Sequence, residues 1–422
     1  MDFKRYIHAH SDELLASLAA LVRIPSVEGE PKEGAPFGKE PARCLHEMLA
    51  LCEKLGFPTE NMDGRVGWCE YGEGEEMVAV LGHLDVVPAG DGWTESEPFS
   101  GEIKNGRIYG RGTMDDKGPM VAAVYALAAL KQSGFQPSRR IRVIFGTNEE
   151  TGCGDMSWYV SHGGELPVYG FTPDGEYPLI NGEKGILNGT YTRTLHQTGD
   201  YILTRFEGGE ASNISPAYAV AEVKCPAEAA SKIAAEKVTV TPIDGGIRVE
   251  AEGVAVHGST PELGENAIGR LAMALAQLPF TGETGECLAF VSERLGMETH
   301  GESLGLAMRD GISGDLTMNV GVATFENEAL SLTFSVRYPV TLPYDLVYPR
   351  LKRGFTLGGF TETEMTHAAA LYIPKDSELI RRLLGVYEAE TGEKRSSPSP
   401  PVRKPLVAAA MARKTAIPYP IP

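Results

Sequence analysis

The sequence predicts an α/β protein, with a three-layer main domain around a mostly parallel sheet and an α+β domain inserted into it. Helical and strand-like segments alternate in β-α-β order up to about residue 150, which is typical of a parallel sheet covered by helices. Alternating strand patterns then dominate, and helical periodicity returns over residues 376–392. The predicted limits are residues 1–184 for the first part of the main domain, 185–370 for the insert and 371–422 for the return.

Local patterns justify each element of the main domain. Apolar residues recur at helical spacing over residues 11–23 and 39–55. A third helix is expected after the sequence DDKG, because Pro119 suits a first helical turn and the run MVAAVYALAALK continues it. Short apolar runs predict three strands, at residues 66–71, 77–82 and 141–147.

Composition limits the classes of partner. A chain of 422 residues exceeds one ordinary domain. Its 42% hydrophobic content supports a packed interior, and its formal net charge is −18. Nucleic acid and anionic membranes both bind basic surfaces, so neither is expected as a partner. We expect a small-molecule partner, and a monomer rather than a dimer.

The cysteines and apolar stretches predict a cytoplasmic location. The N-terminal segment MDFKRYIHAHSDELL is charged and amphipathic, which is not typical of a signal peptide. The clearest apolar stretch, at residues 120–130, is too short to span a bilayer. Six cysteines show no CxxC spacing, so free thiols are expected rather than disulfides.

Polar side chains follow the predicted strands at the points where the strands end. His83 and Asp85 come directly after an apolar run, and ligands of open α/β sheets bind at this edge. A carboxylate beside a metal-binding imidazole commonly orients it. Further acidic residues follow other strand-like runs, at Asp115, Glu149, Glu150 and Asp174. One imidazole with several carboxylates predicts a metal centre with mostly oxygen ligands.

Each of these motifs alone has a simpler interpretation. The sequence HLD can be a polar turn, and DD before a helix is usually an N-cap with first-turn charge. Asp174 in PDG is a good β-turn residue whatever its function. Their ordered occurrence after successive strands favours the metal hypothesis.

The residue types also suggest a chemistry. Two divalent ions about 3.5–4 Å apart can share a carboxylate, polarise a carbonyl and supply a bound hydroxide. Asp115 is placed to bridge them, because it precedes a helix whose N-terminal dipole favours negative charge. Glu150 and Asp174 can complete the two coordination shells, which leaves Glu149 to act as a general base.

The sequence resembles the dinuclear zinc peptidases of family M20, which include carnosinase, aminoacylase and succinyl-diaminopimelate desuccinylase. Within this family it is most similar to the bacterial dipeptidase V branch. The segments that carry the resemblance lie between about residues 80 and 339. They are GHLDVVPAGDGW, GRIYGRGTMDDKGP, GTNEETGCGD, FTPDGEYPLINGEKGI, GVAVHGSTPELGENA and SVRYP.

The resemblance implies a metallo-dipeptidase that hydrolyses unblocked dipeptides, with the inserted domain as a lid. His83 and Asp174 would bind one zinc ion, Glu150 the other, and Asp115 would bridge both. A bridging hydroxide would be the nucleophile. The catalytic roles implied outside the metal shell are a general base and an orienting partner for the imidazole, namely Glu149 and Asp85.

Three residues of the insert are implied to contact substrate. His257 would stabilise the oxyanion, a role in which a positioned donor can contribute several kcal/mol. Asn213 would be a second polar contact, and Arg337 would pair with the C-terminal carboxylate, for which guanidinium offers bidentate geometry. Taken alone, the three could be a turn histidine, a turn asparagine and an exposed strand arginine.

The resemblance ends near the C-terminus. The family takes a histidine for its second zinc from this region, preceded by a loop of the type GGGTYAR. Here the last histidine is His367, and residues 406–414 read LVAAAMARK. Glycine codons read out of frame can yield a run of alanine, so we expect a frameshift from about residue 398, with a genuinely divergent tail as the alternative. The Pro- and Ala-rich tail from about residue 396 is predicted to be irregular, and the second zinc site to be incomplete.

Two alternatives to a dipeptidase follow. An N-acyl-amino-acid deacylase would use the same metals on an amide with a different acyl group. A catalytically impaired binding protein would keep the fold without a complete second metal site. Metal content separates the binding protein from the enzymes, and a substrate panel separates the two enzymes.

Overall fold

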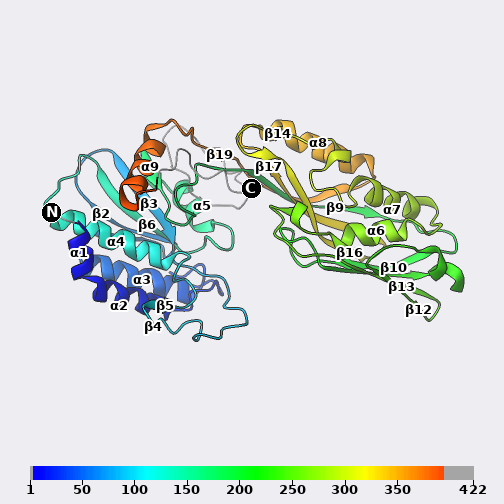
Figure 1. Cartoon of the computed structure of the whole chain (residues 1–422), viewed down its shortest axis with the longest axis horizontal. Helices are drawn as coiled ribbons and strands as arrows, with labels where there is room; N and C mark the ends of the chain where they lie inside the picture. The colour runs from blue at the N-terminus through cyan, green and yellow to red at the C-terminus, as the bar shows by residue number, and fades with distance from the viewer. Residues whose placement is uncertain (1–2, 394–422) are drawn as a thin grey trace. The chain divides into compact units, whose positions relative to one another are not determined.

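The computed structural model describes residues 3–393, which divide into two compact units (Figure 1). The first unit contains residues 3–180 and 373–393, and the second contains residues 181–372. The predicted irregular tail and the predicted frameshift both lie outside the described residues. No helix within residues 3–393 combines the length and the apolar character needed to cross a membrane. All six cysteines are free thiols.

A five-stranded sheet forms the centre of the first unit. Its strands lie in the order β1 (Thr59–Met62), β2 (Val66–Tyr71), β6 (Arg140–Gly146), β3 (Met77–His83) and β7 (Tyr169–Phe171). Strand β3 is parallel to both neighbours, whereas β2 runs antiparallel to β1 and β6. The predicted mostly parallel sheet is thus confirmed, with β2 as the reversed strand.

Helices cover both faces of this sheet. One face packs against α2 (Ser11–Val22), α3 (Lys39–Lys54) and α4 (Lys117–Gln132), and the opposite face packs against α5 (Gly154–Ser161) (Figure 1). Neighbouring residues of β6 point to opposite faces, because Phe145 joins the first core and Ile144 joins the second. The remaining elements of the unit are α1 (Phe3–Ala9), β4 (Glu102–Lys104), β5 (Arg107–Tyr109) and α9 (Glu378–Thr391).

The second unit is built on an eight-stranded antiparallel sheet. Its strands, in spatial order, are β12 (Val238–Ile243), β13 (Gly246–Glu252), β11 (Tyr218–Lys224), β10 (Ile202–Gly208), β16 (Thr317–Glu326), β17 (Ala329–Tyr338), β9 (Gly185–Thr194) and β18 (Thr361–Ala368). Alternate residues of β17, from Leu330 to Val336, enter one large core. Helices α6 (Ala267–Leu275), α7 (Gly282–Arg294) and α8 (Tyr344–Leu357) complete that core (Figure 1).

Short elements join the parts of the second unit. Two small ladders pair β8 (Gly182–Glu183) with β19 (Leu371–Tyr372) and β14 (Arg309–Asp310) with β15 (Gly314–Asp315). Three short 3₁₀-helices are η1 (Ala227–Lys232), η2 (Pro261–Leu263) and η3 (Glu302–Leu304). An antiparallel sheet with helices on one face is the α+β architecture that the sequence predicts for the insert.

Gly82 allows β3 and α4 to approach closely near the end of the strand. A Cβ atom at this position would overlap the Asp116 carboxylate oxygen Oδ2 and the Met120 sulfur. Both neighbours are fully buried, so neither has free space into which it could move.

We therefore expect Gly82→Ala to destabilise the first unit by about 1–3 kcal/mol, the usual cost of overpacking. Urea unfolding followed by tryptophan fluorescence measures this, because the three tryptophans, Trp68, Trp93 and Trp158, all lie in the first unit. Gly385→Ala in α9 is the matched control. Nothing lies within 4 Å of its added Cβ, so it should stabilise the helix by about 0.5–1 kcal/mol. Equal effects of the two substitutions would contradict the packing argument.

Candidate metal centre

His83 is the last residue of β3, and its side chain is only 2% exposed. Its Nδ1 atom lies 3.0 Å from the backbone carbonyl oxygen of Asp85. Because a carbonyl oxygen can only accept, Nδ1 carries the proton and donates it. The lone pair of a neutral imidazole therefore lies on Nε2, which is the tautomer of a metal ligand held by a second hydrogen bond.

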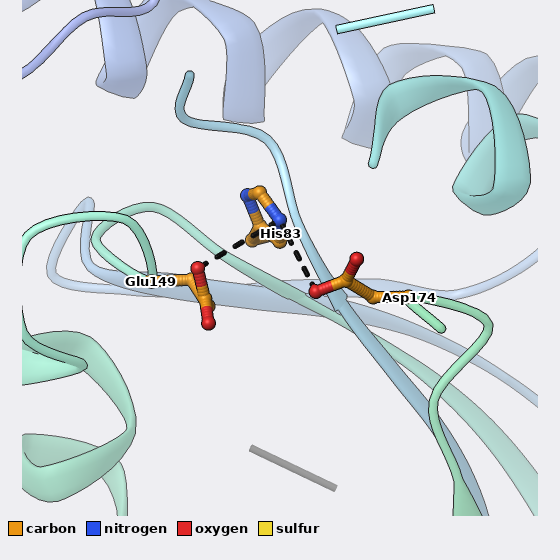
Figure 2. A group of neighbouring side chains, drawn as sticks. All are labelled: His83, Glu149 and Asp174. Carbon is orange, nitrogen blue, oxygen red and sulfur yellow. Dashed lines mark ion pairs between the residues drawn. The ribbon is translucent and has the colours of Figure 1, made fainter. Parts of the chain in front are cut away.

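Carboxylates surround the Nε2 atom of His83. Asp115 Oδ1 lies 3.0 Å away, Asp174 Oδ2 3.6 Å and Glu149 Oε2 4.0 Å. Figure 2 shows the imidazole between Glu149 and Asp174, which come from different loops. Burial acts to lower the pKa of His83, but hydrogen bonds with Asp115, Asp174 and Asp85 outweigh burial and raise it. The same carboxylates would attract a metal cation.

Two sets of side chains have the spacing of metal ligands. One contains His83, Glu149 and Asp174, the other contains His83, Asp115 and Glu150, and within each set the ligand atoms lie within 4.8 Å of one another. Atoms bound to one zinc ion at about 2 Å lie at most about 4 Å apart, so small side-chain rotations suffice. One nitrogen with several carboxylate oxygens fits a divalent ion.

Three carboxyl groups near His83, those of Asp116, Glu149 and Glu150, have a raised pKa. Burial is the main cause, and it raises the pKa of Glu149 to about 7 and that of Asp116 to about 8. Burial also raises the pKa of Glu150, and the neighbouring Asp115 adds to that increase. The cluster therefore concentrates negative charge in a desolvated place, which a bound cation would offset.

Asp115 is held by two buried neighbours in the sequence. Its own side chain is 63% exposed, whereas Asp116 and Lys117 are fully buried. Asp116 occupies the N-cap position of α4 but makes no capping bond there. Its Oδ2 instead accepts the backbone N–H of His83 at 3.3 Å. The Asp115–Asp116 peptide bond is cis.

Lys117 anchors the same segment to the C-terminal end of α2. Its Nζ atom donates to the carbonyl oxygens of Leu21 at 3.0 Å and Ile24 at 2.8 Å, at the C-terminal end of α2. A cation at this end of a helix is favourably placed. The sequence analysis considered Asp116 only as part of the acidic pair before a helix, and it gave Lys117 no role, although a charged residue directly before an apolar helix was a visible signal.

The carboxylate of Asp85 connects His83 to the Glu149–Glu150 pair. It is 2% exposed and lies 3.4 Å from His83 Nδ1. Its Oδ1 accepts the backbone N–H of Glu149 at 3.1 Å, and its Oδ2 accepts that of Glu150 at 3.0 Å. Asp85 thus contacts the imidazole with its backbone carbonyl and the acidic loop with its carboxylate.

A small cavity lies beside the cluster. His83, Glu149 and Asp174 line it together with Cys153 and Met156. Burial raises the pKa of the Cys153 thiol, so the cysteine remains protonated and weakly nucleophilic.

Three of the predicted site residues lie in the second unit. Asn213 and His257 are close together, because the neighbouring N–H of Gly258 donates to the Asn213 carbonyl oxygen at 2.6 Å. His257 Nδ1 accepts the backbone N–H of Ser259 at 3.2 Å. The neutral imidazole therefore carries its proton on Nε2, where it can serve as a donor.

Arg337 is a buried residue of β17 and not an exposed strand arginine. Its side chain is 2% exposed, and its Nε and Nη1 atoms have no hydrogen-bond partner among residues 3–393. Burial lowers its pKa to about 10. A guanidinium without these bonds is suited to bind an anion.

Asn319 ties the loop that carries Asn213 to the sheet, and the sequence analysis missed it. Asn319 lies opposite Ser335, two residues before Arg337 on the same face of the sheet. Its Nδ2 donates to the Ser212 carbonyl oxygen at 3.0 Å, and its Oδ1 accepts from Ser215 Oγ at 2.6 Å. An asparagine inside an otherwise β-forming run was the available signal.

The sequence matches the family described as Peptidase family M20/M25/M40 over residues 79–414. A relative is the Beta-Ala-Xaa dipeptidase of Lactobacillus delbrueckii subsp. lactis, which is 35% identical over 412 residues. That alignment covers 93% of this chain and 86% of the relative.

Solved structures share the fold. The aminoacylhistidine dipeptidase from Vibrio alginolyticus has a TM-score of 0.55 at 15% identity, over 93% of this chain and 86% of that one. Human carnosine dipeptidase 1 has a TM-score of 0.51 at 16% identity, over 95% of this chain and 86% of that one. At these identities the likeness establishes the architecture.

Proposed function

Because this chain belongs to peptidase family M20/M25/M40, we propose that it is a metal-dependent dipeptidase that hydrolyses unblocked dipeptides. The observation that carries the proposal is the convergence of carboxylates on the Nε2 atom of His83. It is supported by a relative named Beta-Ala-Xaa dipeptidase at 35% identity. The name of this relative supports an aminoacyl group on the scissile amide, as in a dipeptide, over the other acyl groups that an N-acyl-amino-acid deacylase would accept.

We assign the metal as zinc and divide the ligands between two positions. His83 and Asp174 would hold the first ion, Glu150 the second, and Asp115 would bridge them. Bound zinc would polarise the scissile carbonyl and acidify a water molecule. The carboxylates would fix the place where this chemistry occurs, because they come from loops at one edge of the five-stranded sheet.

Glu149 would move the proton during hydrolysis. Its carboxylate lies close to the ligands and is 22% exposed, so water can reach it. A general base works best when its pKa is near the working pH, and burial raises the pKa of Glu149 to about 7. It would take a proton from the attacking water and deliver it to the leaving amine.

Residues of the second unit would recognise the dipeptide, which gives this unit the role of a lid. His257 Nε2–H would donate to the oxyanion, and Asn213 would add a polar contact. Arg337 would pair with the free C-terminal carboxylate through bidentate hydrogen bonds. The support for this role is the buried guanidinium, which lacks partners for two of its nitrogens within the described part of the chain.

The first test concerns the base. Glu149→Ala should lower kcat by about 100- to 10,000-fold, the usual contribution of proton transfer, and leave the zinc content unchanged. It is measured by steady-state kinetics and mass spectrometry in a chain that carries a family-like GGGTYAR…His ending. Glu150→Ala is the control and should lose zinc. If Glu149→Ala also loses zinc, Glu149 belongs to the metal shell, in the set it forms with His83 and Asp174.

The second test concerns Arg337 and uses the same ending. Arg337→Ala should reduce kcat/KM strongly for dipeptides with a free C-terminus, since loss of one partner of a desolvated charge pair costs about 2–5 kcal/mol. C-terminally amidated analogues should be affected much less. Arg309→Ala is the matched control, because Arg309 is an exposed arginine of the same unit with a 73% exposed side chain. An equal loss on both substrate types would rule out carboxylate recognition.

The third test concerns the chain with its own tail. His83, Asp174 and Asp115 should hold one zinc ion tightly. The second position has Glu150 and the shared Asp115, and a site with carboxylates alone should bind zinc more weakly. We therefore expect weak or absent peptidase activity. Zinc titration and dipeptide cleavage, beside the chain with a GGGTYAR…His ending, measure both. Two tightly bound ions with full activity would show that the altered tail lies outside the site.

A further inference from the structure

Asp155 is a buried carboxylate to which neither the sequence motifs nor the proposed mechanism gives a role. It belongs to the first turn of α5, and its side chain is 1% exposed. Its Oδ2 accepts the backbone N–H of Thr147 at 2.7 Å and that of Asn148 at 3.0 Å. Both amides belong to the loop that carries Glu149 and Glu150.

Asp155 and Asp85 together receive four consecutive backbone amides. Asp155 binds those of residues 147 and 148, and Asp85 binds those of Glu149 and Glu150. One carboxylate comes from α5 and the other from the segment after β3, so the loop is held from two separate elements. Hydrogen bonds from amides to an ionised carboxylate are stronger than those between neutral groups.

Helix capping does not explain this arrangement. Only one of the three bonds of Asp155 goes to its own helix, from the N–H of Met156 to Oδ1 at 2.7 Å. The other two go to the loop. Gly146, the last residue of β6, is also fitted to the carboxylate, because a Cβ atom there would overlap Asp155 Oδ2.

We propose that Asp155 is a positioning residue for the Glu149–Glu150 pair, and that it acts by fixing the backbone of the loop between β6 and α5. Fixing the amides of residues 147 and 148 sets the direction in which the backbone continues into Glu149 and Glu150. Asp85 then fixes the pair itself, and both glutamate side chains leave the backbone toward His83. The metal-binding part of this inference rests on the proposed function.

Asp155→Asn tests the proposal with little change in volume. An asparagine offers one acceptor oxygen, whereas all three bonds to Asp155 need acceptors. If its oxygen faces the loop, its NH₂ group meets the N–H of Met156 and one bond is lost; in the opposite orientation the NH₂ group meets the amides of residues 147 and 148, and two bonds are lost. The loop should therefore open more often, and the glutamates should be less well placed to bind metal.

Two measurements on the full chain follow. Competition with a chromophoric chelator should show zinc bound about 10- to 100-fold more weakly by Asp155→Asn than by the unchanged chain, the usual effect of losing an outer partner of a metal ligand. Hydrogen exchange of the metal-free protein should be faster by about 10-fold or more at residues 147–150, as expected for loss of a charged hydrogen bond.

Asp310→Asn is the matched control. Asp310 also accepts several backbone amides, those of Ile312 at 3.0 Å, Ser313 at 2.5 Å and Thr341 at 3.1 Å. It lies in the second unit. Its substitution should speed exchange at its own turn and leave zinc affinity unchanged.

The outcomes separate the two proposals. Weaker zinc binding with faster exchange at residues 147–150, in Asp155→Asn alone, supports the positioning role. Unchanged zinc affinity overturns it, and so does weaker binding without faster exchange. If the unchanged chain itself binds no zinc, the proposed function fails, and the exchange measurement alone decides whether Asp155 holds the loop.

If Asp155→Asn does not fold, Asp155→Glu replaces it. That substitution keeps the charge and displaces the oxygens by one methylene, so its effect should be smaller but in the same direction. An affinity equal to that of the unchanged chain would then overturn the role.

Discussion

Each buried carboxylate near His83 must be matched by a donor or a cation, and this requirement organises the first unit. An unmatched buried charge is costly, by several kcal/mol even after the surroundings relax. Backbone N–H groups bind three of the carboxyl groups. These are Asp85, Asp155 and, through Oδ2 alone, Asp116, whose buried Oδ1 has no hydrogen-bond partner among the described residues. The others face the imidazole, namely Asp115, Glu149 and Asp174. Negative charge is thus concentrated around one point, which favours the binding of a cation.

Glycines at the strand ends make this matching possible. His83 of β3 lies opposite Gly146 of β6, and Gly82 lies opposite Phe145. Each of the two glycines leaves space that a buried aspartate fills, Asp116 at Gly82 and Asp155 at Gly146. Without Cβ atoms at these positions, carboxylates from two helices can reach the ends of two neighbouring parallel strands. The glycines at the sheet edge and the buried carboxylates beside them are therefore parts of the same packing arrangement.

The sequence predicts the parts of this arrangement that depend on residue type and order. The apolar runs of β3 and β6 and the acidic residues that follow them predict the sheet and the edge where the side chains gather. The short elements β1, β7 and α5 span too few residues for a periodic pattern to identify them. The roles of Asp116, Lys117 and Asp155 depend on which backbone groups their side chains reach, and a one-dimensional pattern does not contain that information. The same holds for the burial of Arg337, which the sequence pattern of β17 does not reveal.

The coordination chemistry of the cluster depends on the single imidazole, that of His83, which its two ligand sets within the described residues share. One lone pair on Nε2 can serve only one ion. In the proposed assignment, the first position would therefore combine nitrogen with oxygen, a set that suits zinc. The second would have oxygen ligands alone among the described residues, a set that suits harder ions such as manganese or magnesium. The proposed bridging residue, Asp115, directly precedes two residues that are anchored without any ion. Asp116 accepts the backbone N–H of His83, and Lys117 donates to backbone carbonyl oxygens at the end of α2. A nitrogen ligand supplied from beyond residue 393 would thus change the metal preference of the second position without requiring the first to rearrange.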